Sequence, residues 1–157
     1  MSIIRDKREN QGLRLIVRRQ PDESVELDLE TSLEKYTFKL NSDDGVESKD
    51  RNIMIELTIE GKLAKEVAGE ASVYFTEWAL DDTDEAYRYV ELMKYNVNVC
   101  GKKYVLPNAF VVDYEESTNN KSDDHPKFSL FIKQNKDERS DFSVTANEIA
   151  YPSEIEE

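Results

Sequence analysis

The chain has 157 residues, which is enough for one domain with one hydrophobic core. Its net charge of −13 argues against binding to nucleic acid, because phosphate contacts need Lys and Arg. Aromatic residues make up 10% of the chain, which argues against full disorder, and no apolar run approaches the length of a membrane helix, so membrane insertion is not expected.

The charge is unevenly distributed along the chain. Residues 1–20 carry six basic and two acidic side chains, a net of +4, which leaves −17 for the remainder. Such asymmetry permits head-to-tail electrostatic matching between copies, although solvated charged faces are the commoner explanation. Cys100 is the only cysteine, so an internal disulfide is excluded and a reducing compartment is expected. Met1–Asn10 does not resemble a secretion signal, which favours synthesis in the cytoplasm and leaves later export inside an assembly open.

The first half of the chain is dominated by alternating apolar and polar residues. Residues 1–11 are predicted to form a flexible N-terminal segment. Alternation at a period of two predicts four strands, at residues 13–18, 25–30, 36–40 and 53–60. Residues 41–52 form a long polar loop, and loops of this length are usually flexible or functional. Gly61 is predicted to end the fourth strand.

The pattern then changes to that of a helix, at about residues 62–80. Apolar residues recur there at three- and four-residue steps: Leu63, Val67, Ala71, Tyr74 and Trp78. Gly69 weakens this helix by roughly 1 kcal/mol relative to alanine. Strand patterns return at 86–95 and 97–114, with Cys100–Lys102 as the predicted tight turn between them.

The rest of the chain holds a second polar loop and two further strands. The loop covers residues 115–127, and the strands cover 128–133 and 142–146. Seven or eight strands and one helix predict a single, mainly β domain at residues 12–150, in the form of a β-barrel of two packed antiparallel sheets with one flanking helix. Residues 151–157 are predicted to be an acidic tail.

Residues that could support chemistry are few. His125 is the only histidine and lies in a polar loop, and one His with one Cys cannot make a zinc site. Two groups of acidic residues could offer oxygen ligands to calcium: Asp81, Asp82 and Asp84 in one, and Asp113, Asp123 and Asp124 in the other. Their spacing matches no EF-hand loop, so solvated loop acids are the preferred interpretation. We therefore predict no enzyme activity, no cofactor and no metal.

The most informative stretch is Lys103–Glu116 (KYVLPNAFVVDYEE), in which Pro107–Asn108 separates two apolar runs. Because proline has no N–H to donate, the pattern predicts a strand with an enforced irregularity. Taken alone, such a stretch is most often an ordinary bulged strand.

This stretch, together with Phe128–Gln134 (FSLFIKQ), resembles the tube proteins of contractile injection systems, the Hcp and phage-tail-tube superfamily. The resemblance lies around residues 85–134. The helix with Glu77–Ala79 and the strand pair after it also stand in the expected order, and the match covers about half of the chain. Relatives carry a glycine-containing turn where this chain has Asn119–Pro126. The motif residues are Tyr104, Leu106, Pro107, Asn108, Ala109, Phe110, Val112, Asp113, Tyr114 and Glu115.

The resemblance implies a β-barrel with a flanking helix whose copies form rings, of six, that stack into a hollow tube. Such a subunit acts by self-association, with sheath, baseplate and spike proteins and a protein effector cargo as its expected partners. It would belong to an injection particle or virion-like tail that is exported or released. The family's long loops and chain ends connect the rings, and the candidate residues here are Asp43, Asp44, Gly45, Asn119, Asn120, Asp123 and Asp124.

Two other interpretations stay open at this point. A stand-alone adaptor could keep the barrel, lose the stacking, and hold a protein effector or a carbohydrate with its acidic surface and long loops. An enzyme would need a nucleophile with a base nearby, and the sequence offers no pair of that kind.

Overall fold

The computed structural model describes residues 3–9, 11–42, 53–121, 125–135, 142–146 and 149–151. Within these ranges the structure is mainly β, with one α-helix, α1 (Ala68–Leu80), and a short 3₁₀ turn, η1 (Asp84–Ala86). The strands are β1 (Ile4–Asp6), β2 (Gly12–Arg19), β3 (Ser24–Leu29), β4 (Leu33–Ser42), β5 (Ile53–Lys62), β6 (Arg88–Asn96), β7 (Val99–Ser117), β8 (Lys127–Gln134), β9 (Ser143–Ala146) and β10 (Ile149–Tyr151).

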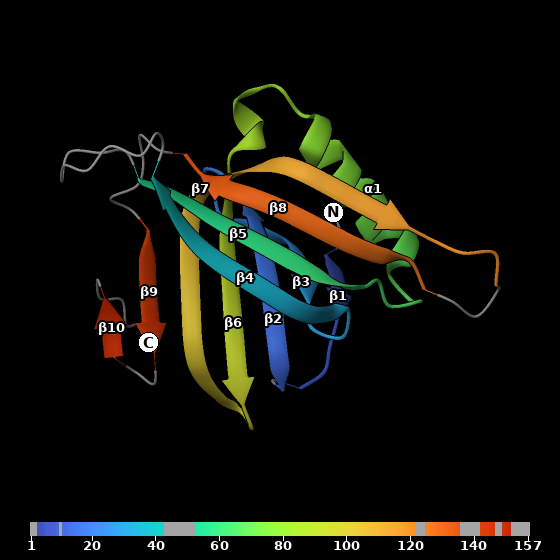
Figure 1. Cartoon of the computed structure of the whole chain (residues 1–157), viewed down its shortest axis with the longest axis horizontal. Helices are drawn as coiled ribbons and strands as arrows, with labels where there is room; N and C mark the ends of the chain where they lie inside the picture. Colours follow the sequence, from blue (N-terminus) through green and yellow to red (C-terminus); the bar gives the residue numbers. More distant parts are fainter. Residues whose placement is uncertain are drawn as a thin grey trace.

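The described strands belong to one hydrogen-bonded sheet in the order β1-β3-β2-β6-β7-β8-β5-β4, with β9 added to β7 and β10 added to β9. All pairs are antiparallel except β1 with β3, which is parallel. Strands β4, β5 and β8 cross in front of β2 and β6, and α1 lies along one side (Figure 1). The prediction of a mainly β domain with one helix is confirmed. The prediction of two packed sheets is not confirmed, because the described strands form one continuous sheet, which folds over on itself into two layers.

Strand β7 joins the two layers. It is 19 residues long, pairs with β6 as far as Ala109, and pairs with β8 from Ala109 onward. The register against β6 shifts next to Pro107, where the chain has no N–H to offer the ladder. The irregular strand predicted from Pro107–Asn108 is therefore present, and the irregularity lies where β7 passes from one layer to the other.

The core fills the space between the layers and under the helix. The inward positions predicted from alternation are buried, including Leu15, Leu57 and Ile59, each with no exposed surface. Phe75 and Trp78 of α1 close the core on the helix side, and Phe75 stacks on Phe128 with ring centroids 5.6 Å apart. Strand alternation and helix periodicity thus identify the same interior, which is the consistency expected of a well-specified fold.

Helix α1 begins later than predicted. The sequence pattern placed its start near residue 62, but β5 continues to Lys62 and Val67 is the N-cap residue. The Leu63 N–H donates to the Pro126 carbonyl at 2.8 Å, and the Ala64 N–H donates to the Ser32 hydroxyl at 2.8 Å. These tertiary bonds keep Leu63 and Ala64 out of the helix, and residues 65–67 form a turn before it, even though the apolar spacing continues that of the helix. In the described part of the chain, no helix combines the length and apolarity that crossing a membrane requires.

The N-terminal segment, predicted to be flexible over residues 1–11, contains β1. The buried carboxylate of Asp6 accepts hydrogen bonds from the N–H groups of Glu30, Thr31 and Ser32 and from the Ser32 hydroxyl. This part of the segment is therefore attached to the turn between β3 and β4. The predicted acidic tail, residues 151–157, lies outside the described residues except for Tyr151.

Candidate functional site

The motif residues lie along β7 and divide into a buried and an exposed set. Tyr104, Leu106 and Ala109 point into the core and are at most 5% exposed. Pro107, Asn108, Phe110 and Tyr114 are partly buried, whereas Val112, Asp113 and Glu115 are exposed. The motif therefore combines core packing in the first half of β7 with a solvent-facing second half.

Polar side chains hold the joint at Pro107–Asn108. The Asn108 N–H donates to the side-chain carbonyl of Gln134, which is 1% exposed, at 3.1 Å. The Asn135 N–H donates to the Asn108 carbonyl at 2.8 Å, and the Gln20 amide donates to the Pro107 carbonyl. These bonds satisfy backbone groups that the register shift removes from the ladder. The two motif strands therefore meet in one structural joint. It consists of Pro107 and Asn108 on β7 and Gln134 at the end of β8.

Gln134→Leu should lower the free energy of unfolding by about 2 kcal/mol, because it leaves the part-buried Asn108 N–H without this acceptor. Urea denaturation followed by circular dichroism measures the loss. Lys127→Leu, at the exposed first residue of β8, is the matched control and should change stability by less than about 0.5 kcal/mol. Equal effects of the two substitutions would contradict a structural role for Gln134.

The second half of β7 is supported by the helix. The Tyr114 ring lies 5.4 Å from the Phe75 ring, and its hydroxyl donates to the Glu116 carboxylate at 2.5 Å. Burial and this hydrogen bond raise the pKa of Tyr114 above its ordinary value, so the hydroxyl stays a donor at neutral pH. Tyr114 is accordingly a packing residue, while Asp113 and Glu115 face solvent.

The loop residues proposed as inter-subunit contacts are only partly covered by the structure. Asp43, Asp44, Gly45, Asp123 and Asp124 lie outside the described residues. Asn119 and Asn120 are described and exposed, in the segment after β7. The Asn119 side chain accepts a hydrogen bond from the Lys121 N–H at 2.9 Å, a local turn contact that places both asparagines at the surface.

The basic residues near the N-terminus are paired within the chain. Arg14 forms two hydrogen bonds to the Asp28 carboxylate, at 2.9 and 2.8 Å, and Lys7 lies 3.3 Å from Glu30. Burial is the largest influence on Asp28 and opposes its charge, but the hydrogen bond from Arg14 and the positive charges of Arg14, Lys7 and Arg5 together outweigh it and lower the pKa of Asp28. Most basic side chains of residues 1–20 are therefore paired with acids on β3, in the turn after it, on η1 or on β6, and they are poor candidates for contacts between copies.

A different surface feature, a groove, lies between α1 and the edge of the sheet at β1. Its volume is about 600 Å³. The apolar part of its lining consists of Ile4, Gly69, Val73 and the ring of Tyr74. The charged part consists of Arg19, Glu26, Glu70, Glu77 and Arg88. Sequence analysis did not find this groove, because its residues come from five elements and Tyr74 reads as one more position of the helix's apolar stripe.

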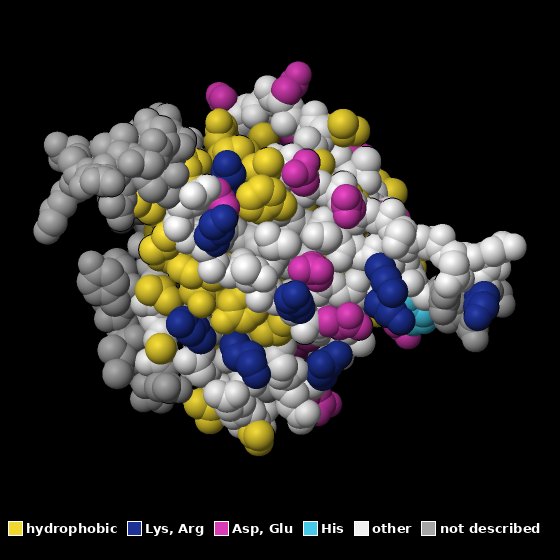
Figure 2. All heavy atoms as spheres, viewed as in Figure 1, with side chains coloured by type: hydrophobic (Ala, Val, Ile, Leu, Met, Phe, Trp, Pro, Cys, Tyr) yellow, Lys and Arg dark blue, Asp and Glu magenta, His cyan; other side chains and the backbone are white. Residues whose placement is uncertain are grey.

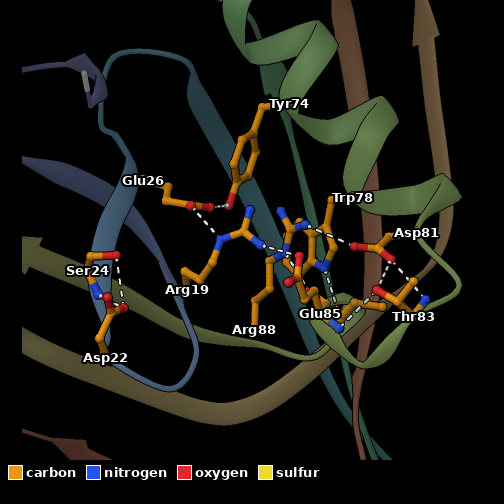
Figure 3. A network of polar contacts seen from close by, with 11 residues as sticks. Arg19, Asp22, Ser24, Glu26, Tyr74, Trp78, Asp81, Thr83, Glu85 and Arg88 are labelled. Atoms are coloured by element: carbon orange, nitrogen blue, oxygen red, sulfur yellow. Dashed lines mark hydrogen bonds and ion pairs between the residues drawn. The ribbon is translucent and has the colours of Figure 1, made fainter. Parts of the chain in front are cut away.

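The floor of the groove is a network of ion pairs (Figure 3). Arg19 lies between Glu26 and Glu85, with N–O distances of 2.6 and 2.9 Å, and the Tyr74 hydroxyl donates to Glu26 at 2.8 Å. Burial raises the pKa of Tyr74 above its ordinary value, and the hydrogen bond to Glu26 raises the pKa of Arg19. Each charged group has a partner, so the network fixes the shape of the groove.

Arg88 connects this network to the end of the helix. Its side chain is buried, donates to the Glu85 carbonyl at 3.0 Å and lies 3.4 Å from Asp81. The guanidinium also stacks on the rings of Tyr74 and Trp78, at 5.2 and 5.5 Å. Asp81, one of the acids considered for calcium, is thus engaged by Arg88 and by the Thr83 hydroxyl, whose hydrogen bond lowers the pKa of Asp81. In the described residues no three His, Cys, Asp or Glu side chains are grouped so as to hold a metal ion.

The hairpin between β6 and β7 carries the second notable surface feature. Asn96 pairs with Val99, so the turn consists of Val97 and Asn98, both with positive φ (52° and 65°). This is the geometry of a two-residue hairpin turn, for which Asn-Gly is the preferred sequence. The prediction of a turn at Cys100–Lys102 was therefore wrong by three residues: Gly101 lies in β7 beside a register shift, at a bulge.

Comparisons with known proteins identify the fold. No protein-family model matches the chain, and no curated protein sequence matches it significantly. Among solved structures, the chain is similar to the Hcp1 protein of the E. coli EAEC 042 pathovar, with a TM-score of 0.61 and 10% identity over 87% of this chain and 92% of that one. A chain of the anti-feeding prophage baseplate gives a TM-score of 0.54 and 12% identity over 94% and 99%. Hcp1 from Flavobacterium johnsoniae gives 0.50 and 10% over 84% and 93%.

These similarities cover nearly the full length of each protein. The fold places the protein in a mainly β class, in which one curled sheet carries a single helix on its side. Within that class the chain has the Hcp-like tail-tube fold.

Proposed function

We propose that this protein is the structural inner-tube subunit of a contractile injection system. Its copies form six-membered rings, and the rings stack into a hollow conduit for cargo. The observation that carries the proposal is the Hcp-like fold, matched over 87% of this chain and 92% of the E. coli Hcp1 chain. So complete a match leaves little of either chain for a separate binding or catalytic module.

The edge of the sheet offers a means of self-association. Strand β4 is ten residues long and hydrogen-bonds to β5 on one side only, within the described residues. An exposed edge of this length presents unpaired backbone groups to a neighbouring chain. Leu40 on this strand is 58% exposed and adds apolar surface. In our proposal, this edge pairs with a neighbouring copy and contributes to closing the ring.

The proposal also defines the partners. The principal partner is a second copy of the same chain, followed by the sheath around the tube and the baseplate and spike proteins at its end. A protein effector would be carried inside the tube. The subunit would perform no chemistry, and it would reach the outside of the cell only as part of a particle or virion-like tail.

Electron microscopy of the purified full chain, with light scattering for its mass, tests this function. Rings or stacks of rings are the expected result, at masses that are multiples of 18.2 kDa. Leu40→Lys should shift the protein from rings toward folded monomers, because a lysine on an edge strand opposes edge-to-edge pairing. Leu80→Lys replaces a leucine that is 77% exposed at the end of α1, and as the matched control it should leave the rings intact.

A monodisperse 18.2 kDa monomer at every concentration, with or without sheath and baseplate proteins, would overturn the proposal. That result would favour a stand-alone adaptor with the same fold. Rings that persist in Leu40→Lys would retain the function and exclude β4 as the edge that closes them.

A further inference from the structure

The two surface features lie at opposite ends of the molecule. Arg88 begins β6 and lines the groove, whereas Asn96 ends β6 and precedes the hairpin turn. The nine residues of β6 span about 26 Å at roughly 3.3 Å per residue. Strand β2 runs the other way beside it, and its first residue, Gly12, pairs with Tyr95 near the turn, while its last, Arg19, reaches the groove.

The hairpin tip, defined as Val97, Asn98 and Val99, exposes apolar side chains. Val97 is 77% exposed and Val99 is 53% exposed. A β-branched residue at positive φ is a strained choice in a turn for which Asn-Gly is preferred. The turn geometry alone therefore does not explain why a valine occupies this position. A contact that buries the Val97 side chain would explain it.

The two ends carry opposite charge. The hairpin side has Lys94, Lys102 and Lys103, and residues 92–112 contain no acid. Acidic side chains surround the other end: Glu70, Glu77, Asp81, Asp82, Asp84 and Glu85. Of these, only Asp81 and Glu85 form ion pairs within the described residues. On the face that Figure 2 displays, hydrophobic side chains reach the surface at the end of the molecule where the β6–β7 hairpin lies.

The groove is suited to receive an apolar tip. Its volume of about 600 Å³ lies within the roughly 300–1,000 Å³ range of binding pockets. Val73, which is 56% exposed, and Ile4 provide apolar walls, and no atom lies within 4 Å of the position that a Gly69 Cβ would occupy. The buried pairs beneath fix the floor, and Glu70 and Glu77 on the rim are placed to meet lysines beside an incoming tip.

We propose that the hairpin tip of one copy docks into the groove between α1 and β1 of a second copy in the next ring. Tip and groove are different surfaces at opposite ends of one chain, so the contact is head-to-tail and repeats without closing, as a stack requires. The inference rests on the proposed tube function and specifies which surfaces join successive rings.

Disulfide trapping tests the contact directly. In a Cys100→Ser background, Val97→Cys is combined with Val73→Cys, and the full chain is assembled and oxidised. Val97 follows the far end of β6, whereas Val73 on α1 lines the groove at the Arg88 end, so cysteines at the two positions are too far apart to join within one chain, since a disulfide needs Cα atoms within about 7 Å. The expected result is a ladder of linked chains on a non-reducing gel. Neither single-cysteine variant should give a ladder, and Val97→Cys with Leu80→Cys, outside the groove on the same helix, should give a much weaker one.

A second variant removes the more exposed of the two valines of the tip without harming the fold. Val97→Asn with Asn98→Gly creates the preferred turn sequence, so the melting temperature should stay the same or rise. Stacks should fall to single rings in electron micrographs. Val112→Asn, at a valine that is 39% exposed on β7, is the matched control and should form stacks of normal length.

The outcomes separate this inference from the proposed function. Stacked wild-type rings with no disulfide ladder, or stacks of normal length in the Val97→Asn/Asn98→Gly variant, would overturn tip docking and leave the tube function standing. A wild-type chain that forms neither rings nor stacks would overturn both. A ladder together with single rings in the turn variant would establish the contact.

Discussion

Gly61→Ala should destabilise the protein by about 3 kcal/mol, at the upper end of the cost of overpacking. A Cβ at this position would lie 1.9 Å from the carbonyl oxygen of Ser32 and 3.0 Å from its carbonyl carbon. Both are backbone atoms of the turn into β4, and the Ser32 carbonyl also accepts a hydrogen bond from the Lys62 N–H at 3.0 Å. Backbone cannot swing aside as a flexible side chain can, so the strands themselves must move.

Gly69→Ala is the natural control, because it makes the same chemical change where no atom lies within 4 Å of the new Cβ. Since Gly69 lies in the first turn of α1, alanine should stabilise the protein by up to about 1 kcal/mol. Thermal and urea denaturation should show changes in the free energy of unfolding of opposite sign for the two variants. A Gly61→Ala protein as stable as wild type would show that the close approach of β5 to Ser32 is dispensable.

Gly61 also illustrates what the sequence could and could not predict. Alternation identified the inward face of β5 correctly, because a period of two places Ile55, Leu57 and Ile59 on one side of any strand. The same pattern made Gly61 the end of the strand. In the structure β5 continues to Lys62. A glycine is needed at position 61 because the backbone of Ser32 lies too close to leave room for a Cβ. A close approach of this kind is a tertiary contact, and it produces no periodic pattern in the local sequence.

The start of the helix shows a related limit. Leu63 and Val67 fit the spacing of the helix and are buried as predicted, but they precede α1. Hydrophobic spacing reports which side chains face the core, and here a turn at residues 65–67 before the helix satisfies it as well as a longer helix would. The bonds from Leu63 to Pro126 and from Ala64 to Ser32 decide between the two.

The sequence predicted the irregular strand of the motif but not the groove. Proline at Pro107 signals a break in the ladder from sequence alone, and the register of β7 shifts beside it. The groove was not predicted, since Arg19, Glu26 and Arg88 look like ordinary outward charges of separate strands until the fold brings them under Tyr74. A valine in a hairpin turn is unusual and would point to a contact surface. The sequence did not identify Val97 as a turn residue, because that assignment depends on how β6 pairs with β7.

Asp6→Ala should lower the free energy of unfolding by about 3–5 kcal/mol, because it removes the acceptor for several buried donors at once. The carboxylate accepts from the Thr31 N–H at 3.0 Å, from the Ser32 N–H at 3.1 Å and from the Ser32 hydroxyl at 2.5 Å. Asp6 is 7% exposed, so water cannot readily replace these bonds. Hydrogen exchange should accelerate in β1 and in the turn between β3 and β4, which would lose their shared attachment.

Asp22→Ala provides the matched control for that variant. Asp22 caps its own turn in the same manner, accepting from the Ser24 N–H and hydroxyl at 3.1 Å each, but it is exposed. Solvent can satisfy those donors, so the cost should stay below about 1 kcal/mol. Because Asp6 and Gly61 both act on Ser32, the double variant Asp6→Ala/Gly61→Ala should lose less than the two single losses together. Similar losses for Asp6→Ala and Asp22→Ala would show that the N-terminal segment is not held by this buried carboxylate.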